Sequence, residues 1–293
     1  MKLVLHPTKV RVRNLKKDIE TNRQNYIGGS DIGAILGLNE YKSAYALWCE
    51  KTGLTEPENI DDKESVWWGS NTEELIAKRF CMKTGKRVKK SNYAYGLVEY
   101  PFIRAHVDRL IIGENAGLEC KATDVWKYNY EAGEVPPAHY SQTQFYMAVT
   151  GRKNWYLATH RGNGNFHINS IARNDEFIEQ MLDAITDFWN HVVSGTPVPV
   201  DGSDSTRETI EKQFPDSSAE AETVNLNEQE GTLVALLALK KQEQSLKELK
   251  NQYQSEIKLA LGEAERGESD QFYVSWKSNS KGSRVFRFLE KPV

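Results

Sequence analysis

The pattern of hydrophobic and polar positions divides the chain into a long region that mixes two kinds of segment and a shorter region dominated by one helical pattern. Apolar residues that recur every three or four positions predict helices, whereas clusters of branched and aromatic residues predict strands. The helical pattern is found in residues 26–37, 43–53, 66–84, 136–150, 175–194 and 226–261. The strand pattern is found in residues 102–112, 118–122, 154–161 and 165–173.

Glycine-containing turns mark several of these boundaries. A Gly28-Gly29 turn leads into the first helical segment, where Ser30 or Asp31 is expected to accept hydrogen bonds from the unpaired amides of the first turn. The sequence GENAG joins the first two strands into a hairpin. The turn Gly162-Asn163-Gly164 joins the other two strands in the same way.

The pattern changes after residue 200 and suggests three parts: a domain over 1–205, a linker over 206–225 and a C-terminal part over 226–293. Residues 200–224 are rich in Ser, Asp, Glu and Thr and contain few apolar positions, which favours a linker or mobile segment. The tail over 271–289 alternates aromatic and polar residues and predicts a small hairpin. A seven-residue apolar repeat predicts a short coiled-coil-like stripe, formed by Leu239, Leu246 and Tyr253 with Gln242 and Leu249 between them.

Composition and charge narrow the class of protein. At 39% hydrophobic and 27% charged residues, the composition is that of an ordinary globular protein. The N-terminal sequence is not a signal peptide and no apolar run is long enough for a membrane span, so we expect a cytoplasmic protein without a membrane partner. The net charge of −3 requires a nucleic-acid binder to concentrate its cations on one face. The candidate run, which also fits an ordinary solvated surface, is Lys78, Arg79, Lys83, Lys86, Arg87, Lys89 and Lys90.

The central chemical signal is Asp108 followed by Glu119-Cys120-Lys121. Residues two apart in a strand share a face, so Glu119 and Lys121 project to one side and Cys120 to the other. A hairpin turn at 113–117 brings Asp108 opposite this segment. Magnesium in proteins usually takes one or two carboxylates together with water and substrate phosphate, and such a metal supports phosphodiester hydrolysis. The alternative is an ordinary cross-strand salt bridge.

Two helices carry candidate supporting groups. Glu73 and Glu74 lie in the helix at 66–84 and offer a further carboxylate for a metal or a water. Gln142 and Tyr146 are four residues apart on the next helix and therefore share a face, where the amide can hold a phosphate or water and the phenol can support it. The alternatives are surface glutamates on the first helix and one polar and one core residue on the second.

Arg23 lies seven residues before Ser30, with the glycine turn between them. An arginine fork and a hydroxyl near a helix N-terminus suit a terminal phosphate. The alternative role of Ser30 is a plain helix cap.

The order of these motifs resembles the YqaJ-type viral recombinase family, which is similar to bacteriophage lambda exonuclease and, more distantly, to RecB-type nuclease domains. The resemblance covers residues 20–200 and is more specific than any single motif. It implies an α/β fold with a restriction-endonuclease-like core, a mixed β-sheet flanked by helices, to which the C-terminal helical segment and small hairpin are added. The motifs that carry it are Arg23, GGSDIGAILG, GSNTEE, HVDRL, ECK and QTQFY.

The resemblance also implies roles for individual residues. Asp108 and Glu119 are expected to bind the metal, with the backbone carbonyl of Cys120 and the helix carboxylate Glu73, in preference to Glu74, as further ligands. Lys121 is expected to be the catalytic lysine. Gln142 and Tyr146 match the Gln-x-x-x-Tyr motif of RecB-type nucleases, and Arg23 and Ser30 are expected to bind the 5′ phosphate of the digested strand.

The function implied is a magnesium-dependent 5′-to-3′ exonuclease on double-stranded DNA that leaves 3′ single-stranded tails for recombination. Manganese is an alternative metal, and two ions per site are expected. The implied setting is a ring-shaped homotrimer, a single-strand annealing protein as partner and a phage- or prophage-encoded protein in a bacterial host.

Several alternatives stay open. One alternative is a structure-specific or nicking endonuclease that uses the same metal site. A second is a DNA-binding module whose nuclease site is vestigial. A third is a coiled-coil scaffold built on residues 226–261. That helical stripe fits either intramolecular packing or an oligomer contact. In one interpretation the tail hairpin contacts DNA or a partner protein through Trp276, Lys277, Arg284 and Arg287. In the other, it packs its aromatic residues on its own helix.

Overall fold

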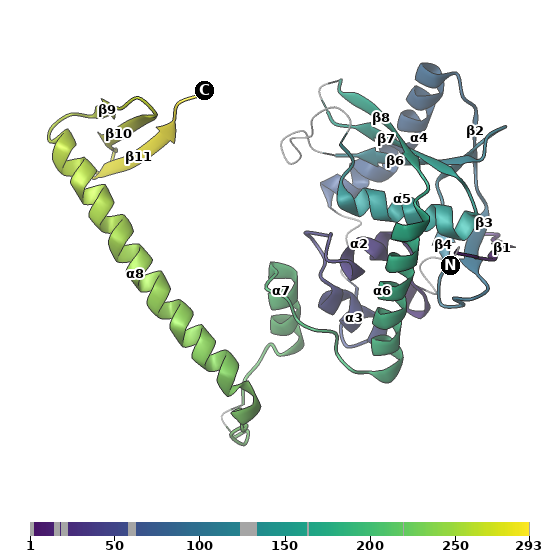
Figure 1. Ribbon diagram of the computed structural model, residues 1–293, viewed down its shortest axis with the longest axis horizontal. Coiled ribbons are helices and arrows are strands. Elements are labelled where there is room, and N and C mark those ends of the chain that lie inside the picture. The colour runs from purple at the N-terminus through teal and green to yellow at the C-terminus, as the bar shows by residue number, and fades with distance from the viewer. Residues whose placement is uncertain are drawn as a thin grey trace. The chain divides into compact units, whose positions relative to one another are not determined.

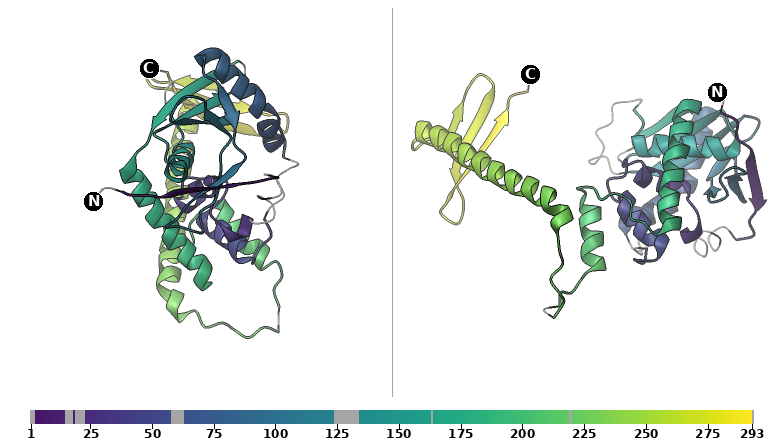
Figure 2. Two further views of the ribbon diagram at one scale, coloured as in Figure 1. Left: turned by 90° about the vertical axis from the view of Figure 1, so that its right-hand side faces the viewer. Right: turned by 60° about the horizontal axis from the view of Figure 1, so that its bottom comes forward.

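The computed structural model describes residues 3–14, 18, 23–57, 63–123, 134–162, 164–218 and 220–292. The chain divides into two compact units, Met1–Ser217 and Ser218–Val293 (Figures 1 and 2). Among the described residues, no helix combines the length and apolar character that a bilayer span requires. Asn163 of the predicted second hairpin turn lies outside the described residues.

A five-stranded mixed sheet forms the centre of the N-terminal unit (Figure 1). Among the described strands of this sheet, only β6 and β7 are parallel, and the connection that such a pair requires is made through helix α5 (Pro137–Thr150). The prediction of a mixed sheet flanked by helices is confirmed. The strands lie in the order β2 (Val88–Lys90), β5 (Arg109–Ile111), β6 (Ala116–Ala122), β7 (Asn154–His160) and β8 (Phe166–Ala172).

Helices α4 (Glu64–Thr84) and α5 cover opposite faces of this sheet (Figure 1). Leu118 and Cys120 of β6 pack with Phe80 of α4 in one buried cluster. A second and larger cluster joins β7 and β8 to α5. Because successive side chains of a strand point to opposite faces, Glu119 and Lys121 lie on the α5 side. The alternation predicted for this strand therefore determines which helix each side chain meets.

A second sheet lies beside the first, with the strand order β1 (Pro7–Arg11), β3 (Tyr93–Leu97), β4 (Ala105–His106). β4 pairs with β3, whereas β5 pairs with β2, so the chain passes from one sheet to the other at Val107 and Asp108. The prediction of one strand over 102–112 is therefore wrong. Branched residues indicate an extended chain, but they do not show which neighbour it pairs with.

Helices α2 (Ile32–Ile35) and α6 (Asp175–Ser194) pack against α5 on the same side of the sheet, and α3 (Ala44–Thr52) packs on α2 and α6. The structure differs from the linker predicted over 206–225, because its first part belongs to helix α7 (Asp204–Gln213), which packs on α3. The phenol of Tyr45 donates to Gln213 Oε1 at 3.0 Å, and Thr206 is only 2% exposed. The N-terminal unit therefore includes α7, and the boundary between the units lies at Ser217–Ser218 instead of residue 205. A hydropathy pattern does not detect polar contacts of this kind.

The C-terminal unit consists of helix α8 (Glu230–Leu261) and a three-stranded sheet. The predicted helix and hairpin are present, and β9 adds a third strand to the hairpin. No residue of α8 is buried, so its apolar stripe is exposed. The strands lie in the order β11 (Arg284–Glu290), β10 (Phe272–Ser278), β9 (Arg266–Glu268).

The charged and aromatic side chains of the tail hairpin contact residues of this same unit. The guanidinium of Arg284 lies 3.6 Å from the ring centroid of Trp276 and donates to the carbonyls of Gly262 and Ala264. Trp276 also packs near Lys258 of α8, whose ammonium lies 5.9 Å from the ring centroid. Of the two interpretations of the tail, the described contacts favour packing of its aromatic residues on their own helix.

Candidate metal and DNA-end site

Asp108 and the β6 segment converge as the hairpin pattern predicts. Arg109 pairs with Leu118, which places Asp108 opposite Glu119. The amide of Cys120 donates to Asp108 Oδ2 at 3.1 Å. The ammonium of Lys121 lies 2.7 Å from Glu119 Oε1. Two carboxylates and one ammonium therefore meet on the α5 side of the sheet.

The two carboxylates repel one another in a buried setting. Burial, and then the negative charge of Glu119, raise the pKa of Asp108 to about 7. Burial, the largest single influence, lowers the pKa of Lys121, but the charges of Glu119 and Asp108 and the hydrogen bond to Glu119 together raise the net pKa. Lys121 therefore carries its proton at neutral pH. The negative charge of Glu119 opposes ionisation of Asp108.

The donor set fits a hard divalent cation. Glu119 is only 3% exposed, and its Oε2 is buried without a hydrogen-bond partner among the described residues. An unpaired buried carboxylate oxygen beside a second carboxylate is a costly arrangement that a cation relieves. No third His, Cys, Asp or Glu side chain joins the pair within the part of the chain that the structure describes. Two carboxylates suffice for magnesium, which keeps several waters and takes substrate phosphate as a ligand.

Gln142 and Tyr146 line the same side of the sheet from α5. The amide nitrogen of Gln142 donates to the Tyr146 hydroxyl at 2.7 Å, and both side chains are buried. Burial, and then the charges of Glu119 and Asp108, raise the pKa of Tyr146. The phenol therefore stays protonated next to the carboxylates. The spacing of four residues on one helix face correctly predicted that Gln142 and Tyr146 lie together.

His139, in the first turn of α5, is a residue that the sequence did not single out. Burial, and then the charge of Lys121, lower its pKa to about 3. Its Nδ1 is buried without a hydrogen-bond partner among the described residues. A neutral imidazole thus faces the lysine side of the site, and nothing in the spacing of the helix indicated it.

Glu73 does not join the carboxylate pair in this structure. It forms an ion pair with Arg109 Nη1, and Glu74 Oε2 lies 2.9 Å from Arg109 Nη2. Arg109 is 2% exposed and lies on the α4 side, next to the thiol of Cys120 at 4.0 Å. Because Arg109 and Asp108 are adjacent, their side chains point to opposite faces. Glu73 pairs with Arg109 and therefore lies on the face opposite Asp108. The sequence did not single out Arg109 for this role.

Arg23 and Ser30 meet as the spacing predicts. The Nη2 of Arg23 donates to Ser30 Oγ at 2.9 Å and also forms an ion pair with Asp31. Its Nη1 is buried and has no hydrogen-bond partner among the described residues, so one donor is available to an anion. Ser30 is exposed and lies in the 3₁₀ turn Gly29–Asp31 that precedes α2.

Asp31 and Lys51 hold this arginine, and neither was predicted as part of the site. Asp31 accepts from the Gly28 amide at 3.0 Å and lies 3.1 Å from the ammonium of Lys51. Lys51 in turn donates to the carbonyls of Arg23 and Tyr26, each at 2.6 Å. Burial lowers the pKa of Lys51 to about 8 despite the nearby Asp31. Asp31 thus combines a capping hydrogen bond from the Gly28 amide with ion pairs to Arg23 and Lys51.

The two groups of residues are adjacent. The Gly29 backbone lies against the ring of Tyr146, and Arg23 is close enough for its charge to act on the Tyr146 phenol. The arginine–serine pair therefore lies beside the tyrosine that borders the two carboxylates.

The chain is similar to known proteins in sequence and in fold. A family model described as a YqaJ-like viral recombinase domain matches residues 20–153. The uncharacterized protein YqaJ of Bacillus subtilis (strain 168) is 32% identical over 281 residues, which is 92% of this chain and 88% of that protein. These matches confirm the resemblance drawn from the motif order.

The fold is similar to that of an alkaline exonuclease, LHK-Exo, from Laribacter hongkongensis. The TM-score is 0.50 at 17% identity, over 61% of this chain and 93% of that one. The structure of LHK-Exo in complex with dAMP gives a TM-score of 0.52 at 19% identity, with the same coverage. At these identities the likeness concerns the fold.

Proposed function

We propose, from the premise that this chain belongs to the family of YqaJ-like viral recombinase domains, that it is a metal-dependent deoxyribonuclease acting in DNA recombination. The observation that carries the proposal is the convergence of Asp108, Glu119 and Lys121 around a buried carboxylate oxygen without a partner. A salt bridge alone explains Lys121 and Glu119, but it leaves the second carboxylate and that oxygen without a role. The exonuclease-type fold is consistent with this activity.

In this proposal Asp108 and Glu119 hold magnesium, or manganese, with the Cys120 carbonyl as a further ligand. The bound metal supplies an activated water and stabilises the charge on the phosphate. Two ions per site are expected once substrate phosphate adds its oxygens. Glu73 is left out of the ligand set, because it neutralises Arg109 on the other face of the sheet.

Lys121 acts as an ammonium. Its raised pKa keeps the proton on the side chain, so it orients the attacking water and stabilises negative charge as hydrolysis proceeds. The Glu119 carboxylate holds the Lys121 ammonium in position at 2.7 Å. Gln142 and Tyr146 offer an amide and a phenol to a phosphate or water on the same face.

A 5′-to-3′ direction on double-stranded DNA requires a grip on the 5′ end of the digested strand. Arg23 and Ser30 are the proposed grip, with the spare Nη1 donor of Arg23 and the exposed Ser30 hydroxyl directed to the terminal phosphate. Their position beside Tyr146 brings that phosphate next to the metal site. Digestion from this end leaves a 3′ single-stranded tail.

The wider setting is carried from the family resemblance. We propose that the enzyme works as a ring-shaped homotrimer in the host cytoplasm, beside a single-strand annealing protein that receives the 3′ tail. The exposed apolar stripe of α8 is available for contacts between proteins.

A nuclease assay with magnesium tests the proposal. It compares linear duplex with a 5′ phosphate, linear duplex with a 5′ hydroxyl and closed circular plasmid. Loss of the phosphorylated linear DNA with the circle intact supports the exonuclease. Cutting of the circle identifies an endonuclease with the same metal site. Retained DNA binding without cleavage in magnesium or manganese identifies a vestigial module and contradicts the proposal.

A further inference from the structure

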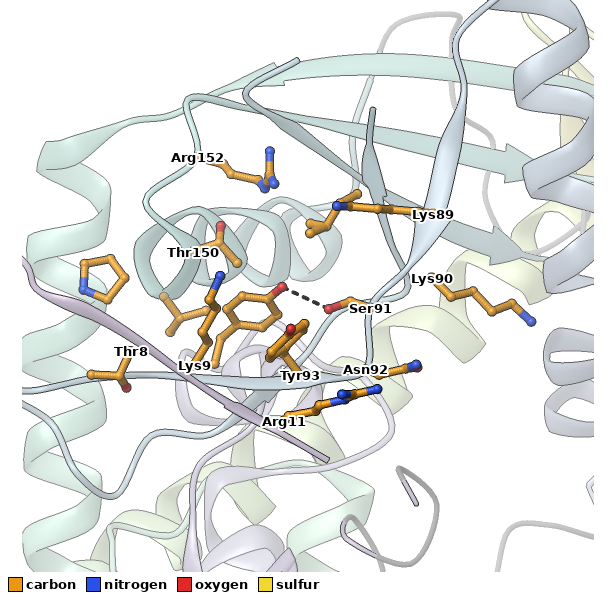
Figure 3. Close-up of a pocket in the computed structure, with 14 residues that line it drawn as sticks. Thr8, Lys9, Arg11, Lys89, Lys90, Ser91, Asn92, Tyr93, Thr150 and Arg152 are labelled. Carbon is orange, nitrogen blue, oxygen red and sulfur yellow. Dashed lines mark hydrogen bonds between the residues drawn. The ribbon is translucent and has the colours of Figure 1, made fainter. Parts of the chain in front are cut away.

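A basic pocket lies at the C-terminal end of α5, between β1 and the β2–β3 segment (Figure 3). Its volume is about 700 Å³. Five of its lining residues are cations and none is acidic; the cations are Lys9, Arg11, Lys89, Lys90 and Arg152. A pocket with this charge and no carboxylate in its lining favours an anionic ligand.

Most of these cations are not neutralised within the protein. In the described part of the chain, Lys9, Arg11 and Lys89 have no carboxylate partner. Lys90 pairs with Glu74 at 2.9 Å, but both side chains are well exposed, so the pair is weak. Arg152 donates to the Glu114 carbonyl at 3.0 Å. The cations therefore remain available for phosphates.

An aromatic ring adds a second kind of contact. The ammonium of Lys9 lies 5.2 Å from the ring centroid of Tyr93, which lines the pocket together with Tyr95. Figure 3 shows Tyr93 next to Lys9 and Arg11. Cations combined with aromatic rings are typical of surfaces that bind single-stranded nucleic acid, because rings stack on bases while cations hold the backbone.

The pocket lies close to the metal site. Leu110 lines it and is two residues from Asp108, on the same side of the sheet. Thr150 lines it and is eight residues after Gln142 on α5, which corresponds to about 12 Å along the helix. That separation equals about three or four nucleotides of a strand that keeps the stacked, duplex-like rise of about 3.4 Å per nucleotide.

We propose that this pocket binds a short segment of single-stranded DNA, the strand that remains when its complement is digested. A cavity of this size admits about a nucleotide or two but not a double helix. The assignment rests on the proposed nuclease function, which produces such a strand near the pocket. It also divides the predicted basic run, because Lys89 and Lys90 line the pocket whereas Lys78, Arg79 and Lys83 lie on α4.

Binding of a short fluorescein-labelled oligo(dT), followed by anisotropy in EDTA, tests the pocket without any cleavage. The variant Lys9→Gln/Lys89→Gln is compared with Lys78→Gln/Lys83→Gln, which removes the same charge from exposed positions on α4. We expect the pocket variant to bind about tenfold more weakly, with a salt slope smaller by about 1.4, and the control to change little. Tyr93→Leu is expected to weaken binding several-fold without changing the salt slope.

Three results overturn the proposal: equal loss in the two double variants, an equal loss of affinity for duplex of the same length, and displacement of the oligonucleotide by polyglutamate at comparable charge concentration. The second result assigns the pocket to duplex phosphates and the third to an acidic peptide. Binding is measured in EDTA, where no cleavage occurs. A protein that binds the oligonucleotide as expected but shows no nuclease activity would therefore contradict the proposed function and not the pocket.

Discussion

Gly29 lies directly against the ring of Tyr146. A Cβ atom at Gly29 would lie 2.5 Å from Tyr146 Cε1 and 2.8 Å from the phenol oxygen, closer than real side-chain contacts allow. The glycine thus brings the turn that carries Ser30 onto the tyrosine that borders Asp108 and Glu119. Through this contact, the proposed grip on the DNA end and the proposed metal site form one continuous surface.

Gly29→Ala should therefore displace the Tyr146 ring or the turn. We expect cleavage of 5′-phosphorylated duplex to fall at least about tenfold and the free energy of unfolding to fall by about 1–3 kcal/mol, while magnesium affinity changes little. Gly69→Ala is the control, because a Cβ there meets nothing within 4 Å and lies in helix α4. Wild-type cleavage in Gly29→Ala would show that the close approach has no part in activity.

Lys121→Ala should abolish cleavage while leaving DNA binding largely intact. Within the part of the chain that the structure describes, its ammonium is the cation that pairs with Glu119, and its loss removes the group proposed to position the water. We expect a decrease of at least about a hundredfold in the cleavage rate. Lys86→Ala, which breaks an exposed pair with Glu114, should cleave normally. Full activity of Lys121→Ala removes the lysine from the mechanism.

Magnesium binding should depend on pH through Asp108. Its pKa is raised from 3.8 to about 7. Between pH 3.8 and pH 7, Asp108 therefore keeps its proton in the folded metal-free protein but has lost it in the unfolded chain. Stability of the metal-free fold therefore falls as pH rises through this window and the carboxylate ionises. A metal needs the ionised form, so its affinity should fall up to about tenfold per unit below pH 7.

Calorimetry in two buffers of different ionisation enthalpy measures this proton release. Near pH 6 we expect binding of magnesium to release close to one proton, and above pH 8 almost none. Asp108→Asn should remove both the release and most of the affinity. Affinity that is independent of pH between 6 and 8 would contradict the assignment of Asp108 as a ligand.

Arg23→Ala should slow digestion most on 5′-phosphorylated ends. The charged fork has its strongest interaction with a terminal phosphate, which a 5′ hydroxyl lacks, so the preference between the two ends should shrink about tenfold. Ser30→Ala should act in the same direction with a smaller effect. The ratio of initial rates on the two substrates is the measurement, and equal slowing on both ends would count against end binding.

The placement of the candidate site's side chains was largely predictable because it depends on short-range rules. Glu119 and Lys121 share a face by strand alternation, and Gln142 and Tyr146 share one by helical spacing, and the structure keeps both pairs together. The mixed sheet followed from the motif order. These features need only local geometry and the family resemblance.

The parts that were missed depend on contacts between distant segments. Glu73 was expected at the metal, but Arg109, on the opposite face, holds it. Lys51 and Asp31 secure Arg23 through a network that spans three elements. The first part of the predicted linker is a helix that Ser205 and Gln213 fasten to the start of α3, by accepting from the Ser43 amide and the Tyr45 phenol. Residue spacing carries no information about such partners.

The most direct test of the central claim is the rate at which Glu119→Gln and Glu114→Gln digest 5′-phosphorylated linear duplex in magnesium, beside the wild type. Each variant loses one carboxylate charge, but only Glu119 holds the buried oxygen without a partner. We predict that wild type and Glu114→Gln digest the DNA, that EDTA stops both, and that Glu119→Gln stays folded but is at least about a hundredfold slower. Digestion by Glu119→Gln at the wild-type rate, or no digestion by the wild type in magnesium or manganese, would contradict it.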